Sequence, residues 1–145
     1  MVSHLDQLSS ALPGETEIPD EISGLRMTRQ RQEIYRILLS GRDHPTAQDV
    51  FMRAKDRLPH ISLATVYNCL EALVQHGIVR QVNFERESSR YCPNVQEHVH
   101  LHDPTTGKIH DIEFKPGFNL ADILEIPHGV EIEGVEITLR GKVSA

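Results

Sequence analysis

Three short amphipathic segments between residues 28 and 77 constrain the fold of this chain most strongly. Each begins after a threonine or serine that can cap a helix, and each ends at a glycine or proline. The caps are Thr28, Thr46 and Ser62, and the stops are Gly41, Pro59 and Gly77. Apolar residues recur at helical spacing in between: Ile34, Ile37, Leu38; Val50, Phe51, Ala54, Leu58; Val66, Cys69, Leu70, Leu73 and Val74. The pattern predicts three consecutive helices.

Two strand-like pieces follow the third helical segment. They are Ile78–Phe84 and Arg90–Cys92, separated by a polar turn at residues 85–89. Three helices followed by a hairpin are the layout of a winged helix-turn-helix, in which the third helix enters the major groove and the hairpin touches the DNA backbone. The sequence therefore favours an α+β fold with an N-terminal winged-helix domain over residues 25–92.

Candidate contacts to double-stranded DNA lie at two places in this domain. The outward face of the third segment offers short hydrogen-bonding groups and an aromatic ring that can pack on a thymine methyl, and arginines near the first segment can grip phosphates or enter a minor groove. These residues are Ser62, Thr65, Tyr67 and Asn68, and Arg26, Arg29 and Arg31. In the alternative interpretation the arginines only solubilise the surface, and Tyr67 is a half-buried packing residue.

The charge distribution is compatible with a nucleic-acid partner, although the net charge is −6. Residues 1–25 carry five acids and no Lys or Arg, residues 26–90 carry eleven Lys or Arg against seven acids, and residues 91–145 carry four against nine. Affinity for phosphates depends on the local face presented to the duplex. The basic block coincides with the predicted DNA-binding domain.

The remaining bulk features exclude several classes of protein. No apolar run approaches the roughly 18 residues of a membrane span, and the N-terminus lacks the pattern of a secretory signal, so we expect a cytoplasmic protein with no membrane partner. Residues 1–24 are predicted to be a mostly flexible acidic extension with room for one short helix. Because Cys69 and Cys92 are the only cysteines, neither a disulfide framework nor a four-cysteine zinc site is expected.

After Pro93 the sequence pattern changes from mainly helical to mainly strand-like. Strand-like segments surround a short helical candidate, Leu120–Leu124, and a turn from Asp103 to Gly107 joins the first two strands. The strand-like segments are His98–His102, Lys108–Phe114, Val130–Ile132 and Val135–Leu139. Residues 93–145 are thus predicted to form a small α/β unit with too little material for a self-sufficient core, completed by pairing with a second copy.

Three histidines alternate in the first of these strands. Because side chains repeat every two residues along a strand, His98, His100 and His102 project from one face. Protonated neighbours would repel, and buried neutral ones each need a partner, so a shared metal ion explains the cluster. Nitrogen and oxygen ligands suit Fe²⁺, Mn²⁺, Zn²⁺ and Co²⁺. The alternative is a solvated polar strand face without a ligand.

The sequence resembles that of the ferric uptake regulator family from about Leu25 to Gly141. The resemblance rests on Ile61–Asn68 (ISLATVYN), Ser88–Tyr91 (SSRY), the His98-x-His100 pair and Gly107-Lys108-Ile109. It implies a homodimer of two-domain subunits that, when loaded with metal, binds AT-rich palindromes and usually represses genes. It also implies a regulatory ion, Fe²⁺ or Mn²⁺ with Zn²⁺ as a further option, at the hinge between domains. The ligands would be His44, Cys92, His98, His100 and Asp111.

The sequence departs from the family pattern in three places. The paired CxxC motifs that hold a structural zinc are missing, with Asp103–Thr106 standing in the first position, so no structural zinc is predicted. Cys92 occupies a position usually held by Asp or Glu, where it is either a soft, oxidisable ligand or a small buried hydrophobe. The auxiliary metal site is poorly matched, and its nearest candidates are Glu97, His102 and His110.

The resemblance is strongest to the peroxide-responsive branch, through the SSRY run and the histidine spacing. The resulting expectation is a metal-dependent repressor that controls metal homeostasis or the response to peroxide. The rival from another class is a small metallohydrolase built on the histidine cluster, but no Glu lies at catalytic spacing from the histidines and little chain remains to form a cleft. A metal-buffering protein would leave the helix-turn-helix pattern unexplained.

Overall fold

The computed structural model describes residues 17–41, 43–84, 86–96 and 98–144. It divides the chain into two compact units, one extending to Val95 and the other beginning at Gln96. Among the described helices, none combines the length and the apolar character that crossing a bilayer requires.

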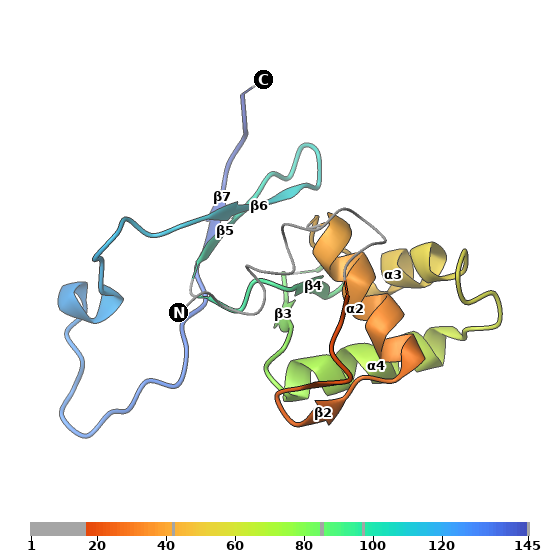
Figure 1. Ribbon diagram of the computed structural model, residues 1–145. Coiled ribbons are helices and arrows are strands. Elements are labelled where there is room, and N and C mark those ends of the chain that lie inside the picture. The colour runs from red at the N-terminus through yellow and green to blue at the C-terminus, as the bar shows by residue number, and fades with distance from the viewer. Residues whose placement is uncertain (1–16, 42, 85, 97, 145) are drawn as a thin grey trace. The chain divides into compact units, whose positions relative to one another are not determined.

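Three helices form the body of the first unit (Figure 1): α2 (Arg29–Gly41), α3 (Ala47–Ala54) and α4 (Leu63–Gln75). All three predicted caps are confirmed. The Thr28 hydroxyl accepts from the Arg31 amide at 3.4 Å, and the Ser62 hydroxyl accepts from the Thr65 amide at 3.1 Å. Thr46 forms a capping box with Asp49, each side chain accepting from the other's backbone N–H. These contacts fix where each helix begins.

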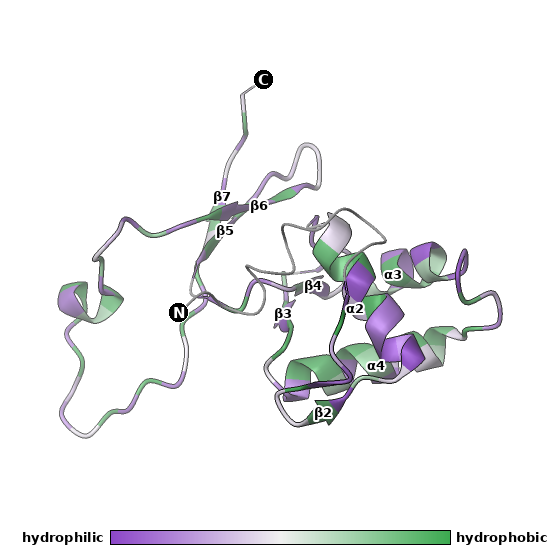
Figure 2. Ribbon diagram, viewed as in Figure 1, coloured by the Kyte–Doolittle hydropathy of each residue, from purple (hydrophilic) through white to green (hydrophobic). Residues whose placement is uncertain are grey.

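The core of the first unit lies where the apolar faces of α2, α3 and α4 meet. Residues predicted from the helical spacing are fully buried there, namely Ile34, Leu38, Val50, Val66, Leu70 and Leu73. In Figure 2, α2 shows both hydrophilic and hydrophobic stretches, in keeping with a helix that buries only part of its surface. The second helix ends earlier than its predicted stop at Pro59. The chain leaves α3 in a tight turn in which the Leu58 amide donates to the Ala54 carbonyl at 2.8 Å.

Ordered structure begins before Leu25, where the sequence predicts a flexible extension to end. The short strands β1 (Glu21–Ile22) and β2 (Leu25–Arg26) pair antiparallel, and Ile18 is buried against the core. The Met27 amide also donates to the Asp20 carbonyl at 2.7 Å. Residues 17–24 therefore belong to the first unit, while residues 1–16, with any short helix there, lie outside the described residues.

A hairpin follows α4 and completes the winged helix-turn-helix. Strand β3 (Arg80–Val82) is shorter than the predicted Ile78–Phe84, whereas β4 (Arg90–Cys92) matches its prediction. The two strands pair antiparallel with Gln81 opposite Tyr91. Gly77, with a φ of 69°, lets the chain reverse after α4 and enter the hairpin.

The second unit contains a sheet of three strands in the order β6-β5-β7. These are β5 (Val99–His102), β6 (Ile109–Ile112) and β7 (Thr138–Arg140), with β5 antiparallel to β6 and parallel to β7. The predicted turn is confirmed. The Gly107 amide donates to the Asp103 carbonyl at 2.8 Å, and Gly107 has a φ of 72°.

The predicted strands Lys108–Phe114 and Val135–Leu139 are found with shorter or shifted bounds, and two other predictions for the second unit are corrected. The helical candidate is a short 3-10 helix, η1 (Leu120–Ile123), capped by Asn119. The predicted strand Val130–Ile132 is not a strand, and Val130 and Ile132 are 53% and 46% exposed. Alternating apolar residues give a segment strand character, but a strand also needs a neighbour that supplies backbone hydrogen bonds.

Candidate metal centre and DNA-binding surface

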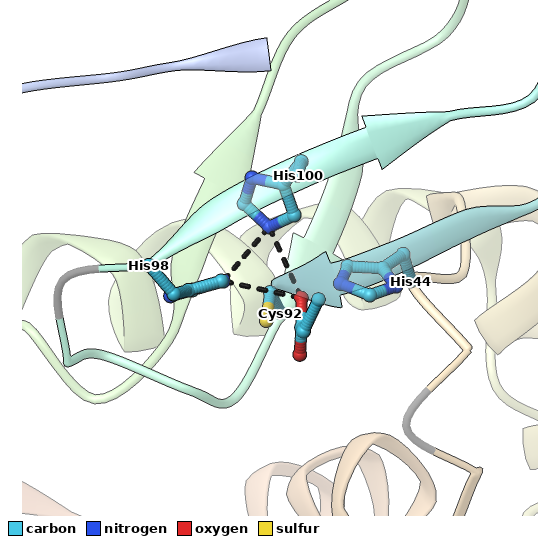
Figure 3. Close-up of side chains that lie close together, drawn as sticks. His44, Cys92, His98 and His100 are labelled. Carbon is cyan, nitrogen blue, oxygen red and sulfur yellow. Dashed lines mark hydrogen bonds and ion pairs between the residues drawn. The ribbon is translucent and has the colours of Figure 1, made fainter. Parts of the chain in front are cut away.

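The second unit brings together two imidazoles and one carboxylate. His98 lies immediately before β5 and His100 within it, so strand alternation directs both toward one face. The β5–β6 register places Asp111 directly opposite His100. The two Nε2 atoms lie 2.9 Å apart, and Asp111 Oδ1 lies 3.2 Å from that of His98 and 3.5 Å from that of His100. Figure 3 shows the two rings converging.

The hydrogen bonding of His98 shows which of its ring nitrogens is available as a ligand. Its Nδ1 lies 2.6 Å from the Gln96 carbonyl oxygen. Because a carbonyl only accepts, Nδ1 carries the hydrogen, and Nε2 of the neutral ring keeps its lone pair. That lone pair faces His100 and an Asp111 oxygen. Metal-ligating histidines commonly donate their other N–H to a carbonyl in this way. The donor set therefore fits a divalent cation.

The other histidines of this sheet do not join that group. His102 shares the face of His100 and stands opposite Ile109, whereas His110 stands opposite Leu101 and so belongs to the other face of the sheet. Neither is part of a metal-ligating group of three or more within the described part of the chain. Glu97, the remaining candidate for an auxiliary site, lies outside the described residues.

The first unit contributes the two other predicted ligands. His44 lies in the loop before α3 and Cys92 ends β4, and both are buried, with 3% and 2% of their surface exposed. One ligand atom of each lies within 4.8 Å of the other's. The two side chains are labelled in Figure 3. Sequence spacing alone does not reveal this proximity, because 48 positions separate the two residues.

Three side chains that hold the His44 loop in place were not predicted from the sequence. Asp43 forms a two-point ion pair with Arg53 of α3, with N–O distances of 2.6 and 3.0 Å. This pairing lowers the pKa of the Asp43 carboxyl, chiefly through the hydrogen bonds from Arg53. Arg90 of β4 donates to the His44 carbonyl at 3.1 Å. The Arg90 of the SSRY run was the available signal, but its partner lies 46 positions away.

The predicted DNA contacts on α4 fall into two groups. Tyr67 is 51% exposed and Asn68 is also exposed, so both are available to a partner. Ser62 and Thr65 are bonded to each other, with their hydroxyl oxygens 2.9 Å apart, and Ser62 also caps the helix. Tyr67 lines a hollow of about 430 Å³. The hollow lies between the first residues of α3, the helix α4 and the β3–β4 hairpin, which is the wing of the winged helix-turn-helix. The surface of α4 beside the wing is therefore open.

The three predicted arginine contacts lie on adjoining elements at the start of the domain. Arg26 ends β2, and Arg29 and Arg31 belong to the first turn of α2. Arg26 and Arg29 are exposed, whereas Arg31 is half-buried and donates through Nη1 to the Arg26 carbonyl at 2.9 Å. Arg31 therefore ties β2 to α2, which gives it a structural role whatever its partner.

Comparison with known proteins identifies the family. The model of the ferric uptake regulator family matches residues 22–140. This chain belongs to the ferric uptake regulator family. It is 36% identical over 121 residues to the peroxide-responsive repressor PerR of Staphylococcus aureus, strain Mu50, across 78% of this chain and 81% of that protein. The same identity and coverage hold for PerR of strain USA300.

Solved structures of this family share the fold. A zinc-bound manganese uptake regulator aligns with 96% of this chain and 98% of its own, with a TM-score of 0.64 and 27% identity. The Campylobacter jejuni peroxide stress regulator aligns with 80% of this chain and 87% of its own, with a TM-score of 0.66 and 27% identity. The predicted fold class is confirmed, and a metallohydrolase receives no support from these comparisons.

Proposed function

We propose that this chain is a metal-dependent transcriptional repressor that binds double-stranded DNA as a homodimer. The observation that carries the proposal is the convergence of His98, His100 and Asp111, whose donor atoms lie 2.9 to 3.5 Å apart. Lone pairs and a carboxylate oxygen at such distances repel unless a proton or cation lies among them. The similarity to the PerR repressors, and to a zinc-bound manganese uptake regulator, supports the same function.

His44 and Cys92 complete the proposed ligand set. Both are buried ligand types from the first unit, whereas the other three ligands come from the second. Ligands drawn from both units would fix the angle between them, and in a dimer that angle sets the spacing of the two α4 helices. This link between ligation and DNA geometry is what would make the protein metal-dependent.

The chemistry of the proposed set is compatible with Fe²⁺, Mn²⁺ or Zn²⁺. Imidazole nitrogen and carboxylate oxygen suit all three, whereas a thiolate from Cys92 shifts the preference toward Zn²⁺ or Fe²⁺. The bound cation would supply positive charge to neutralise Asp111 and the Cys92 thiolate. The two cysteines of the chain are too few for a structural zinc site of four thiolates.

The proposed DNA surface consists of the exposed part of α4 and the arginines at the start of the domain. We expect Tyr67 and Asn68, which are exposed, to read bases in the major groove, and Arg26 and Arg29, also exposed, to contact phosphates or a minor groove. Within the cell the protein would act in the cytoplasm on AT-rich palindromic operators. Its genes would belong to metal homeostasis or to the response to peroxide, as the similarity to PerR suggests.

A gel-shift titration on an AT-rich palindrome tests this function. The protein is titrated after chelation and again with Mn²⁺, or with Fe²⁺ under anaerobic conditions. We expect a shifted complex of two subunits per palindrome only when metal is present. Equal affinity with and without metal would remove the switch from the proposal, and absence of binding under all conditions would remove the repressor.

A further inference from the structure

The backbone of His44 adopts a conformation that side-chain-bearing residues rarely take. Its φ is 55°, in the left-handed region. The residue is neither glycine nor asparagine, so surrounding contacts must hold it there. Because the backbone of His44 is held in this conformation, the direction of its Cα–Cβ bond is fixed. The contacts that hold it therefore bear on where its imidazole lies.

Three contacts fix the loop that carries His44, and two of them come from neighbouring residues of β4. The Asp43 side chain is paired with Arg53 of α3. The His44 carbonyl accepts from Nη1 of Arg90 at 3.1 Å, and the next carbonyl, that of Pro45, accepts from the Tyr91 amide at 3.0 Å. The loop is thus attached on one side to α3 and on the other to the wing.

Arg90 occupies a distinctive place in this arrangement. It pairs across an isolated bridge with Thr46, which caps α3, and it lies two residues before Cys92 on the same strand. Its side chain is half-buried, and within the described residues its Nε atom is buried without a hydrogen-bond partner. The position of the guanidinium therefore leaves one of its N–H groups without an acceptor among the described residues. Its Nη1 instead donates to the backbone carbonyl of His44, a proposed ligand.

We infer that Arg90 is a positioning residue for the metal site, which holds His44 in its left-handed conformation and couples it to the wing strand that carries Cys92. The inference rests on the proposed function, because it assigns Arg90 a role in the regulation of that site. Through Arg90, the loop of one ligand and the strand of the other move as one piece. A change in ligation at His44 is then transmitted to the hairpin beside α4, where DNA is contacted.

The first test uses metal-free full-length protein and asks whether Arg90 holds the loop. In Arg90→Met, amide exchange of Tyr91 should be several-fold faster than in the wild type, while exchange of Leu70 in α4 stays unchanged. Arg86→Met, in the turn of the same hairpin, is the matched control and should leave both amides as they are. Unchanged exchange at Tyr91 would overturn the inference. Should Arg90→Met fail to fold, Arg90→Gln keeps a polar group and is also too short to reach the carbonyl.

The second test asks whether Arg90 acts through His44. Affinity for Co²⁺ is measured by titration in four proteins: wild type, Arg90→Met, His44→Ala and the double variant. Loss of a group that orients a ligand typically lowers metal affinity about tenfold or more, so we expect that loss for Arg90→Met in the wild-type background and less than about twofold in the His44→Ala background. Equal losses in both backgrounds would show a merely structural role.

The two proposals fail in different ways. If the wild type binds Co²⁺ no more tightly than a His98→Ala/His100→Ala variant, the proposed function fails. The exchange of the Tyr91 amide still decides whether Arg90 holds the loop. If the wild type binds Co²⁺ tightly and Arg90→Met binds equally well, the proposed function stands and the role of Arg90 is refuted.

Discussion

The Nε2 atoms of His98 and His100 face each other at 2.9 Å, with their rings inclined at 70°. Two neutral imidazoles reach such a distance when one donates to the other, but Asp111 Oδ1 also lies 3.2 Å from the His98 nitrogen. The carbonyl of Gln96 already takes the Nδ1 hydrogen of His98. A cation bound among the three side chains, as proposed, would accept electron pairs from both Nε2 atoms and from the Asp111 carboxylate at once.

Replacing both histidines by alanine should abolish metal dependence without unfolding the first unit. His98→Ala/His100→Ala removes two nitrogen donors from the proposed site, while the core of α2, α3 and α4 is built from other residues. Metal binding by titration calorimetry should be lost, and helical circular dichroism should persist. His110→Ala, on the opposite face of the sheet, is the control and should bind metal like the wild type. Wild-type binding by the double variant would contradict the proposed site.

The starts of the three helices could be predicted from residues that lie close together in the sequence. Thr28, Thr46 and Ser62 cap the helices where expected, because a cap depends only on residues within one turn. The end of α3 was placed too late. Pro59 shows where a helix cannot continue, but regular helix ends at Ala54 and the chain makes one further turn to Leu58.

Contacts between distant residues could not be predicted in this way. Arg90 and His44 are 46 positions apart, and nothing in the spacing of either segment indicates their hydrogen bond. The segment Val130–Ile132 has the alternation of a strand, but a strand forms only where a neighbour accepts it. The proposed ligand residues of the second unit were easier to single out, because His98 and His100 are neighbours on one strand face and Asp111 follows across one turn.

Substituting Cys92 tests whether its sulfur is a ligand. A thiolate bound to Co²⁺ gives an intense charge-transfer absorption that nitrogen and oxygen ligands do not give. We expect this band in the Co²⁺-loaded wild type and its loss in Cys92→Ser, whereas Cys69→Ser should retain it. Both cysteines are buried, so the pair is a matched comparison. If the wild type lacks the band, Cys92 has a packing role and the proposed ligand set loses its sulfur.

The structure gives Ser62 a measurable role in stability. Its hydroxyl caps α4 by accepting from the Thr65 amide at 3.1 Å. Ser62→Ala should therefore lower the free energy of unfolding by about 1 kcal/mol in urea denaturation, whereas Ser62→Asp, which can also cap, should lose much less. If Ser62→Ala is as stable as the wild type and yet binds DNA more weakly, the residue acts mainly as a DNA contact.

Replacing Tyr67 should weaken DNA binding and leave the stability of the fold almost unchanged, the reverse of what is expected for Ser62. Because half of its surface is exposed, Tyr67→Ala should change the free energy of unfolding by no more than about 0.5 kcal/mol. In the gel shift, however, it should weaken binding to the palindrome about tenfold or more, the loss expected for one good base contact. Met52→Ala, which removes another exposed large side chain but lies on α3 outside the proposed DNA surface, provides the control. A large loss of stability in Tyr67→Ala would instead support the packing interpretation.

The buried Cys69 thiol should make stability sensitive to alkaline pH. Burial among apolar residues raises the pKa of this thiol, since the thiolate would lose its hydration. A group whose pKa is higher in the folded state stabilises the fold fully below its unfolded pKa, about 8.5 for cysteine, and that contribution is lost as pH rises through the folded value. Chelated wild type should therefore lose stability over the alkaline interval above about pH 8.5, as measured by urea denaturation. Cys69→Ala should lose less over that interval, although it starts from a lower stability because of the cavity it creates. Parallel pH profiles for the two proteins would show that Cys69 is not the group responsible.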